Sequence, residues 1–244
     1  NPAAMKIAFG ENPKRVYNDR KQAPSTRMAT AAILREQLFK AKIYKEKLEK
    51  AKTEPDKKPE YDMKLEALLP VLNKEIPLKA HAHRADDIFT ALRIAKEFDL
   101  DITLEHCTEG HLIADYLAKA GKFVVSGPQL CDRSKYELIN KTFKSPAGLA
   151  KAGVKFAIMT DHPVIPIQYL PICAGLAANE GLDELEALKA ITINAAEVLG
   201  LKDRLGSLEV GKDADIVILD GHPFHTISKT THVLIDGKVV FCRE

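Results

Sequence analysis

Short apolar runs alternate with amphipathic helical segments along most of this 244-residue chain. The runs are apolar at both odd and even positions, as expected for strands that are covered on both faces of a parallel sheet. The segments between them, such as 87–98 and 111–120, gather their apolar residues on one face. This alternation predicts an α/β fold with a parallel sheet. The five expected strands span residues 5–9, 76–80, 102–105, 123–126 and 156–160.

The pattern changes after about residue 200. The segments LGSLEVGKDADIVILDG (205–221) and HVLIDGKVVF (232–241) alternate apolar and polar residues between turn signals, and they are rich in β-branched residues. They predict antiparallel strands in a small separate sheet, with a hairpin turn at Asp236-Gly237. We therefore expect two domains, 1–200 and 201–244, with a boundary near residues 199–206.

Composition excludes several classes of protein. The formal net charge is +2, and Lys and Arg are not gathered into one basic tract, so nothing favours binding to nucleic acid. No apolar run approaches the roughly 20 residues that span a bilayer, so we expect no membrane association. The four cysteines are widely scattered and form no CxxC pair, which favours reduced thiols in the cytoplasm. The chain also has no nucleophile elbow, P-loop or dinucleotide fingerprint.

Four side chains with metal-binding groups follow the predicted strands: Glu11, His81, His106 and Asp161. Catalytic groups of parallel (β/α) barrels lie at the carboxyl ends of the strands. His81 and His106 are separated by one strand–helix unit, and His106 and Asp161 by about two. All three residues therefore fall at the same position in successive strand–helix repeats. Imidazole and carboxylate ligands suit zinc or a similar divalent ion.

Each of these residues also has a purely structural interpretation. A lone His or Asp after a strand is usually a hydrogen-bonded rim residue, and GEN before Pro13 resembles a strand-terminating turn. Three candidates in phase with the repeat favour the metal or catalytic role. His83 would face the same side as His81 in extended backbone, so it is a candidate second ligand, a substrate contact or a supporting residue. His111, at an expected helix start, is a candidate substrate contact.

The chain resembles the amidohydrolase superfamily over nearly its whole length. The local marks are KAHAHRADDI, TLEHCTEGH, MTDHP and the closing block ALKAITINAAEVLGLKDRLGSLEVGKDADIVILDG. The resemblance is greatest to the imidazolonepropionase-like and prolidase-type branches. It implies a partial TIM-type (β/α) barrel containing about the last five strands, followed by a small C-terminal β-sheet domain.

The resemblance also implies roles for the four candidate ligands. His81 is similar to the metal-binding histidine of the fifth barrel strand of the family, and His106 to that of the sixth. Asp161 matches the eighth-strand aspartate, which binds metal and handles protons. Glu11 takes the place of a bridging ligand that is more often a carboxylated lysine. The implied cofactor is a divalent metal, zinc, with one or two ions in the complete enzyme.

One family feature is missing from the sequence. Members carry a His-x-His metal pair on the first barrel strand, and nothing before Glu11 supplies it. We therefore expect this chain to be the C-terminal piece of a longer protein. Its expected partners are the missing N-terminal barrel portion or a neighbouring chain, and a small-molecule substrate. A homo-oligomer is left open.

The expected function is a metal-dependent hydrolase of C–N bonds that acts through metal-activated water. Its substrate would be a cyclic amide, an imidazolone-like ring or a dipeptide-type compound. Asp161 would take the proton from the attacking water and return it to the leaving nitrogen. His83 and His111 would bind the substrate. Two alternatives remain: an aminohydrolase that deaminates a heterocycle, and an inactive fragment or pseudoenzyme.

Overall fold

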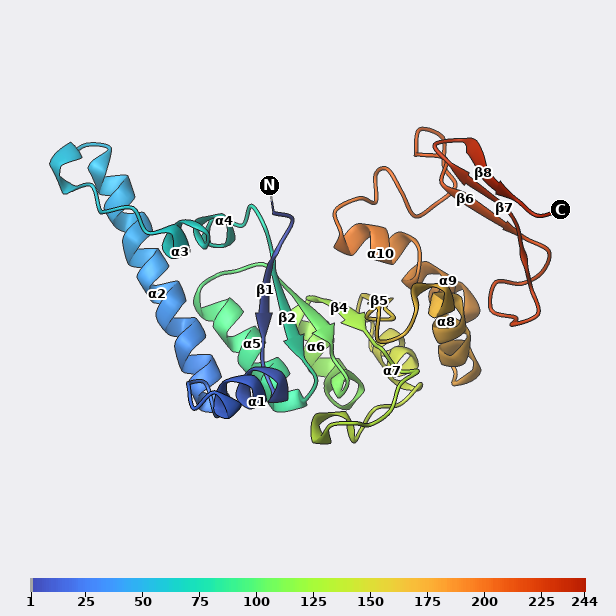
Figure 1. Cartoon of the computed structure of the whole chain (residues 1–244), viewed down its shortest axis with the longest axis horizontal. Helices are drawn as coiled ribbons and strands as arrows, with labels where there is room; N and C mark the ends of the chain where they lie inside the picture. The colour runs from blue at the N-terminus through green and yellow to red at the C-terminus, as the bar shows by residue number, and fades with distance from the viewer. Residues whose placement is uncertain (1) are drawn as a thin grey trace. The chain divides into compact units, whose positions relative to one another are not determined.

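A computed structural model describes residues 2–244. Five strands follow one another in the sheet order β1-β2-β3-β4-β5, and β1 with β2, β2 with β3, and β4 with β5 pair in parallel. Three further strands form a separate antiparallel sheet in the order β6-β7-β8 (Figure 1). This arrangement confirms the predicted part of a (β/α) barrel and the small second sheet. The chain divides into two compact units, residues 1–107 and 108–244, which are described separately below.

The first unit contains three strands and the helices between them. β1 pairs with β2, and β2 pairs with β3, with Ile7 opposite Ala80 and Ala80 opposite Leu104. The strands are β1 (Met5–Ala8), β2 (Leu78–Ala82) and β3 (Ile102–His106). The helices are α1 (Glu11–Asp19), α2 (Arg27–Ala51), α3 (Met63–Glu66), α4 (Leu69–Leu72), α5 (Ala85–Glu97) and the 3-10 turn η1 (Pro55–Lys57).

The helix α2 is long, and most of its surface is in solvent. Its N-cap is Thr26, whose hydroxyl accepts a hydrogen bond from the Ala29 amide at 3.0 Å and so satisfies one free donor of the first turn. Leu38 and Ala41 are fully buried and anchor the helix to the unit. The helix begins at Arg27, directly after this threonine cap.

The two faces of the β2–β3 sheet differ in polarity, whereas the sequence was expected to give strands that are apolar on both faces. Leu78, Ala80 and Leu104 are buried on one face, and α5 contributes Ile88 and Ile94 to the same core. The alternating residues of these strands are polar, because successive side chains of a strand point to opposite faces. The candidate site lies on this polar face.

The second unit contains two strands of the parallel sheet and a run of short helices. β4 (Phe123–Ser126) pairs with β5 (Phe156–Ile158). The helices are α6 (Ala114–Ala120), α7 (Ser145–Lys151), α8 (Leu170–Asn179), α9 (Glu184–Ala190) and α10 (Ile193–Val198). The 3-10 turns are η2 (Gly110–Ile113), η3 (Tyr136–Leu138) and η4 (Ile167–Tyr169).

The small sheet consists of β6 (Ile216–Leu219), β7 (Thr230–Ile235) and β8 (Lys238–Cys242). Asp236 and Gly237 join β7 to β8 with φ values of 49° and 73°. Positive φ at both central residues is the requirement of a type I′ hairpin turn, so the predicted hairpin is confirmed. The boundary predicted between 1–200 and 201–244 falls inside the second unit and stays a prediction.

The bounds of several strands differ from those expected from the sequence. β2 spans Leu78–Ala82, two residues later than the predicted 76–80, so His81 lies inside the strand. β3 ends on His106, one residue later than predicted, and β5 ends at Ile158, two residues earlier than predicted. Each candidate ligand remains at or just beyond the carboxyl end of its strand.

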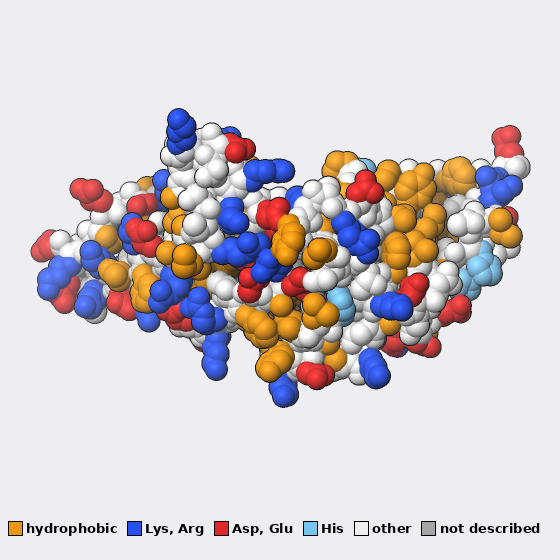
Figure 2. All heavy atoms as spheres, turned by 90° about the horizontal axis from the view of Figure 1, so that it is seen from below, with side chains coloured by type: hydrophobic (Ala, Val, Ile, Leu, Met, Phe, Trp, Pro, Cys, Tyr) orange, Lys and Arg blue, Asp and Glu red, His pale blue; other side chains and the backbone are white. Residues whose placement is uncertain are grey.

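Charged side chains of both signs are interspersed over the face drawn in Figure 2, in agreement with the small net charge. Among the described residues, none of the helices is long and apolar enough to cross a membrane.

Candidate metal centre

The parallel pairing of β2 with β3 places three histidines at one end of the first unit. His81 is the fourth residue of β2, and His83 follows the end of that strand. The register places His81 opposite Glu105 and Ala82 opposite His106. Because His81 and His83 are two residues apart in nearly extended chain, both imidazoles project to the polar face of the sheet.

The backbone of His106 explains how the third imidazole reaches the same face. In a regular strand His106 would point with Ala82, away from His81. Its φ is 71°, whereas a parallel strand has φ near about −120°, so its Cβ is turned by roughly half a circle. A non-glycine residue in this region costs about 1–3 kcal/mol, and such strain concentrates at functional sites. This backbone conformation turns the His106 ring, so that all three imidazoles lie on one face of the sheet.

The three imidazoles form a compact and buried cluster. The ring centroids lie 4.4 Å apart for His81 and His106, 4.5 Å for His83 and His106, and 4.8 Å for His81 and His83. The exposed fractions are only 4–5%. One nitrogen from each ring lies within 4.8 Å of the others. Three nitrogens bound to one tetrahedral zinc ion at about 2.1 Å lie about 3.4 Å from one another, so the ligand nitrogens would have to approach one another by up to about 1.4 Å.

Residues at the start of α1 lie beside the cluster. Asn12 Nδ2 is 3.3 Å from His81 Nε2. Glu11 is the first residue of α1 and is partly buried. The cluster of ligand atoms that lie within 4.8 Å of one another consists of the three histidines and does not include Glu11. Its role as a ligand stays a prediction. Sequence reasoning missed Asn12, although its position beside a candidate ligand at a strand end was an available signal.

A polar network occupies the same face, one layer below the imidazoles. The Thr103 hydroxyl donates to Glu105 Oε1 at 2.6 Å, and Lys79 Nζ lies 3.3 Å from both Thr103 Oγ1 and Glu105 Oε1. Satisfied networks of this kind hold polar side chains rigidly inside a fold. These residues alternate with apolar ones along β2 and β3, and this alternation was the signal that could have found them.

Cys107 follows His106 but is not available for chemistry. Burial raises the pKa of its thiol to about 12, and the side chain is fully buried. Its backbone N–H donates to the Ala82 carbonyl at 3.0 Å and holds the turn after β3 against β2. At neutral pH it offers no thiolate nucleophile.

Two predicted site residues belong to the second unit. Asp161 lies three residues beyond β5, is partly buried, and has a φ of 52°, again in the region that few non-glycine residues adopt. His111 lies in η2, and burial lowers its pKa, which keeps the imidazole neutral at pH 7. The structure thus brings together His81, His83 and His106, while the roles of Asp161 and His111 remain predictions.

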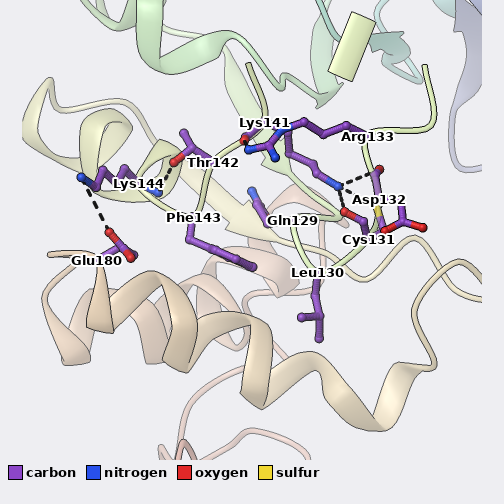
Figure 3. A pocket seen from close by; sticks show the side chains of 10 residues that line it. All are labelled: Gln129, Leu130, Cys131, Asp132, Arg133, Lys141, Thr142, Phe143, Lys144 and Glu180. Atoms are coloured by element: carbon purple, nitrogen blue, oxygen red, sulfur yellow. Dashed lines mark hydrogen bonds and ion pairs between the residues drawn. The ribbon is translucent and has the colours of Figure 1, made fainter. Parts of the chain in front are cut away.

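The second unit also contains a cavity of about 430 Å³ formed by the loop that follows β4. Lys141 Nζ donates to the carbonyls of Cys131 and Asp132, the latter at 2.9 Å, and Arg133 donates to the Lys141 carbonyl at 2.7 Å (Figure 3). These bonds tie the two sides of the loop together. Figure 3 also shows Lys144 facing Glu180 at 3.9 Å across the cavity.

The chain is similar to several known hydrolases. An amidohydrolase, tasK, of Hapsidospora irregularis is 28% identical over 249 residues, which cover 97% of this chain and 25% of its own length. An imidazolonepropionase of Mesorhizobium japonicum is 35% identical over 150 residues, 59% of this chain and 35% of its own. The crystal structure of an amidohydrolase from Thermotoga maritima superimposes with a TM-score of 0.95 and 49% identity.

That alignment covers 100% of this chain and 63% of the Thermotoga chain. The chain therefore spans less than two thirds of each of these proteins. The amidohydrolase family model matches residues 45–240, which include the strands that carry His81 and His106 and the loop that carries Asp161. The family expected from the sequence motifs is confirmed: this chain belongs to the amidohydrolase family.

Proposed function

We propose that the chain supplies the metal-binding and proton-transfer groups of a hydrolase that cleaves a C–N bond in a small amide. The observation that carries the proposal is the buried cluster of three imidazoles at the carboxyl ends of two adjacent parallel strands. Active sites of parallel (β/α) barrels are built at this end. Membership of the amidohydrolase family supports the reaction class.

The donor set fits a divalent metal of the zinc type. Imidazole nitrogen suits zinc, whereas magnesium and calcium prefer oxygen ligands. His81 and His106 would hold the ion, with Glu11 and Asp161 as carboxylate ligands of one or two ions. When bound, such an ion lowers the pKa of water and polarises a carbonyl.

The protein side chains would then guide the proton. Asp161 accepts the proton from the attacking water at its carboxylate and returns it to the leaving nitrogen. The neutral imidazole of His111 contacts the substrate, as either donor or acceptor. The loop from Gly127 to Arg133, which lines the cavity of the second unit, selects the substrate by shape and charge.

The substrate class we propose is a cyclic amide, an imidazolone-like ring or a dipeptide-type compound. A relative named imidazolonepropionase supports the ring compounds. The free cysteines support the cytoplasm as the location. We further propose that the complete site takes residues from an N-terminal barrel portion or a neighbouring chain, because the Thermotoga chain extends well beyond the matched part.

The test uses the complete protein, purified with its metal content measured and screened against cyclic amides and dipeptides. Asp161→Asn should abolish hydrolysis while most of the metal is retained. Asp203→Asn, which changes an exposed carboxylate, is the matched control and should behave as the wild type. Ammonia release from aminated heterocycles would instead indicate a deaminase. A complete protein without metal and without hydrolysis would refute the proposal.

A further inference from the structure

We infer that His83 is a metal ligand, and that His81, His83 and His106 form a three-nitrogen site that assembles within the first unit alone. This inference concerns the site of the proposed hydrolase, but it requires only binding and no turnover. It changes the role of His83 from a substrate contact to a ligand. It also predicts that the 244-residue chain binds a divalent cation without any group from outside residues 1–107.

The position of His83 carries the first step. Its ring is as close to His106, at 4.5 Å between centroids, as the His81 ring is at 4.4 Å. Its exposed fraction is 4%, the same as that of His106. A residue that only contacted substrate would present a face to the space where the substrate binds. His83 is instead packed among the other two imidazoles, at the depth of the other predicted ligands.

The geometry of the set carries the second step. One nitrogen from each ring lies within 4.8 Å of the other two, so the three nitrogens can share one ion after side-chain rotations that bring them up to about 1.4 Å closer together. Three protein ligands with a fourth position left for water or substrate is the usual arrangement of a catalytic zinc ion. Among the described His, Cys, Asp and Glu side chains, only this trio gathers so closely.

The backbone carries the third step. His81 and His106 lie on two neighbouring strands, and His83 directly follows the first of them. The pairing of these strands is fixed by a continuous register from Leu78 opposite Ile102 to Ala82 opposite His106. The His106 backbone is held in the left-handed region that directs its ring to the others. Because rigid strands supply the ligands, the site needs no loop closure and no second body to form.

The chemistry of the ligands predicts the selectivity of the site. Three imidazoles favour cobalt, nickel, copper and zinc. They offer magnesium none of the oxygen ligands that it prefers. The 244-residue chain, freed of metal by a chelator, should bind one equivalent of Co²⁺ and give the visible absorption of a nitrogen-rich, low-coordinate site. One equivalent of Zn²⁺ should displace it, and millimolar Mg²⁺ should not.

The decisive variant is His83→Gln, with Zn²⁺ affinity measured by competition against a chromophoric chelator. Loss of a supporting hydrogen-bond partner already costs about 10–100-fold in metal affinity, so loss of a ligand should cost about 100-fold or more. His225→Gln, at an exposed histidine outside the first unit, is the matched control and should leave affinity unchanged. His83→Cys keeps a zinc-binding donor and should restore most of the binding.

The outcomes separate this inference from the proposed function. If His83→Gln keeps wild-type affinity and Co²⁺ spectrum but lowers hydrolysis by the complete protein, His83 contacts substrate and the inference is wrong. Absence of Co²⁺ binding by the wild-type chain would also overturn it. Metal binding that depends on His83, in a complete protein that hydrolyses none of the amides, would leave the inference intact and refute the proposed function. Far-UV circular dichroism checks the fold of each variant, and His83→Asn, which also removes the imidazole, carries the test if His83→Gln unfolds.

Discussion

Replacing Gly127 with alanine should destabilise the second unit much more than the same replacement at Gly121. Gly127 follows β4 and is buried, with a φ of 137°. A Cβ added there would lie 2.2 Å from the Met159 carbonyl oxygen, where real contacts do not fall below 3.0 Å. The backbone must therefore open by at least 3.0 − 2.2 = 0.8 Å. That movement disturbs the bond from the Met159 amide to the Ser126 carbonyl, now 2.9 Å.

The magnitude follows from these contacts. The unfavourable backbone conformation costs about 1–2 kcal/mol. A buried backbone group that loses its partner costs about 1–3 kcal/mol more. The reduced freedom of the unfolded chain offsets about 0.4–1 kcal/mol. The expected loss for Gly127→Ala is therefore about 2–4 kcal/mol. Gly121 also has a positive φ, 61°, but has nothing within 4 Å of an added Cβ, so only about 1 kcal/mol is expected there.

Urea unfolding followed by far-UV circular dichroism measures the difference. With a slope of about 2–3 kcal/mol per molar urea, the midpoint for Gly127→Ala should fall by about 1 M or more. The midpoint for Gly121→Ala should fall by about 0.5 M or less. Equal shifts for the two variants, or an unchanged midpoint for Gly127→Ala, would refute the claim that close packing of the β4 and β5 ends depends on this glycine.

Three further measurements test other parts of the structure. Thr26→Ala removes the cap that accepts the Ala29 amide and should lower the free energy of unfolding by about 1 kcal/mol, whereas Thr26→Ser should not. Burial lowers the pKa of His111, so the unfolded chain takes up its proton first as the pH falls. Thermal stability should therefore drop below about pH 6.5, and less steeply in His111→Gln; an identical pH profile would contradict the burial of this ring. Cys242 is exposed and should react with a thiol reagent within minutes, while Cys107 should react only after denaturation.

The strands could be predicted where both of their faces are apolar. β4 was predicted with the bounds that it has, Phe123–Ser126. β2 was placed two residues too early because its second half carries His81, a polar residue that ends the apolar run. A strand that lines a polar site breaks the pattern by which buried strands are recognised, so the largest error in strand placement came next to the site.

The candidate site could be predicted in part. The phase of His81 and His106 with the strand–helix repeat was enough to place both at one end of the sheet. The φ of 71° at His106 could not be read from the sequence, because any histidine can occupy either conformation. Asn12 was not recognised as a site residue, because Pro13 after it suggested that the segment forms a turn. Proline is tolerated in the first turn of a helix, whose amides have no partner within the helix, and α1 begins there.

The polar face of the first unit carries little net charge around the three histidines. Lys79 and Glu105 form an ion pair, and the imidazoles are uncharged when they act as ligands, so this face brings no net charge of its own. A divalent cation held by three neutral nitrogens would leave a buried charge of about +2, which is costly where the dielectric is low. Glu11 and Asp161 are each able to supply one negative charge. We therefore expect the imidazoles to provide most of the selectivity for the metal, and the carboxylates to neutralise it and move the proton. On this division of labour, Asp161→Asn should retain the metal and lose the reaction, whereas His83→Gln should lose the metal first.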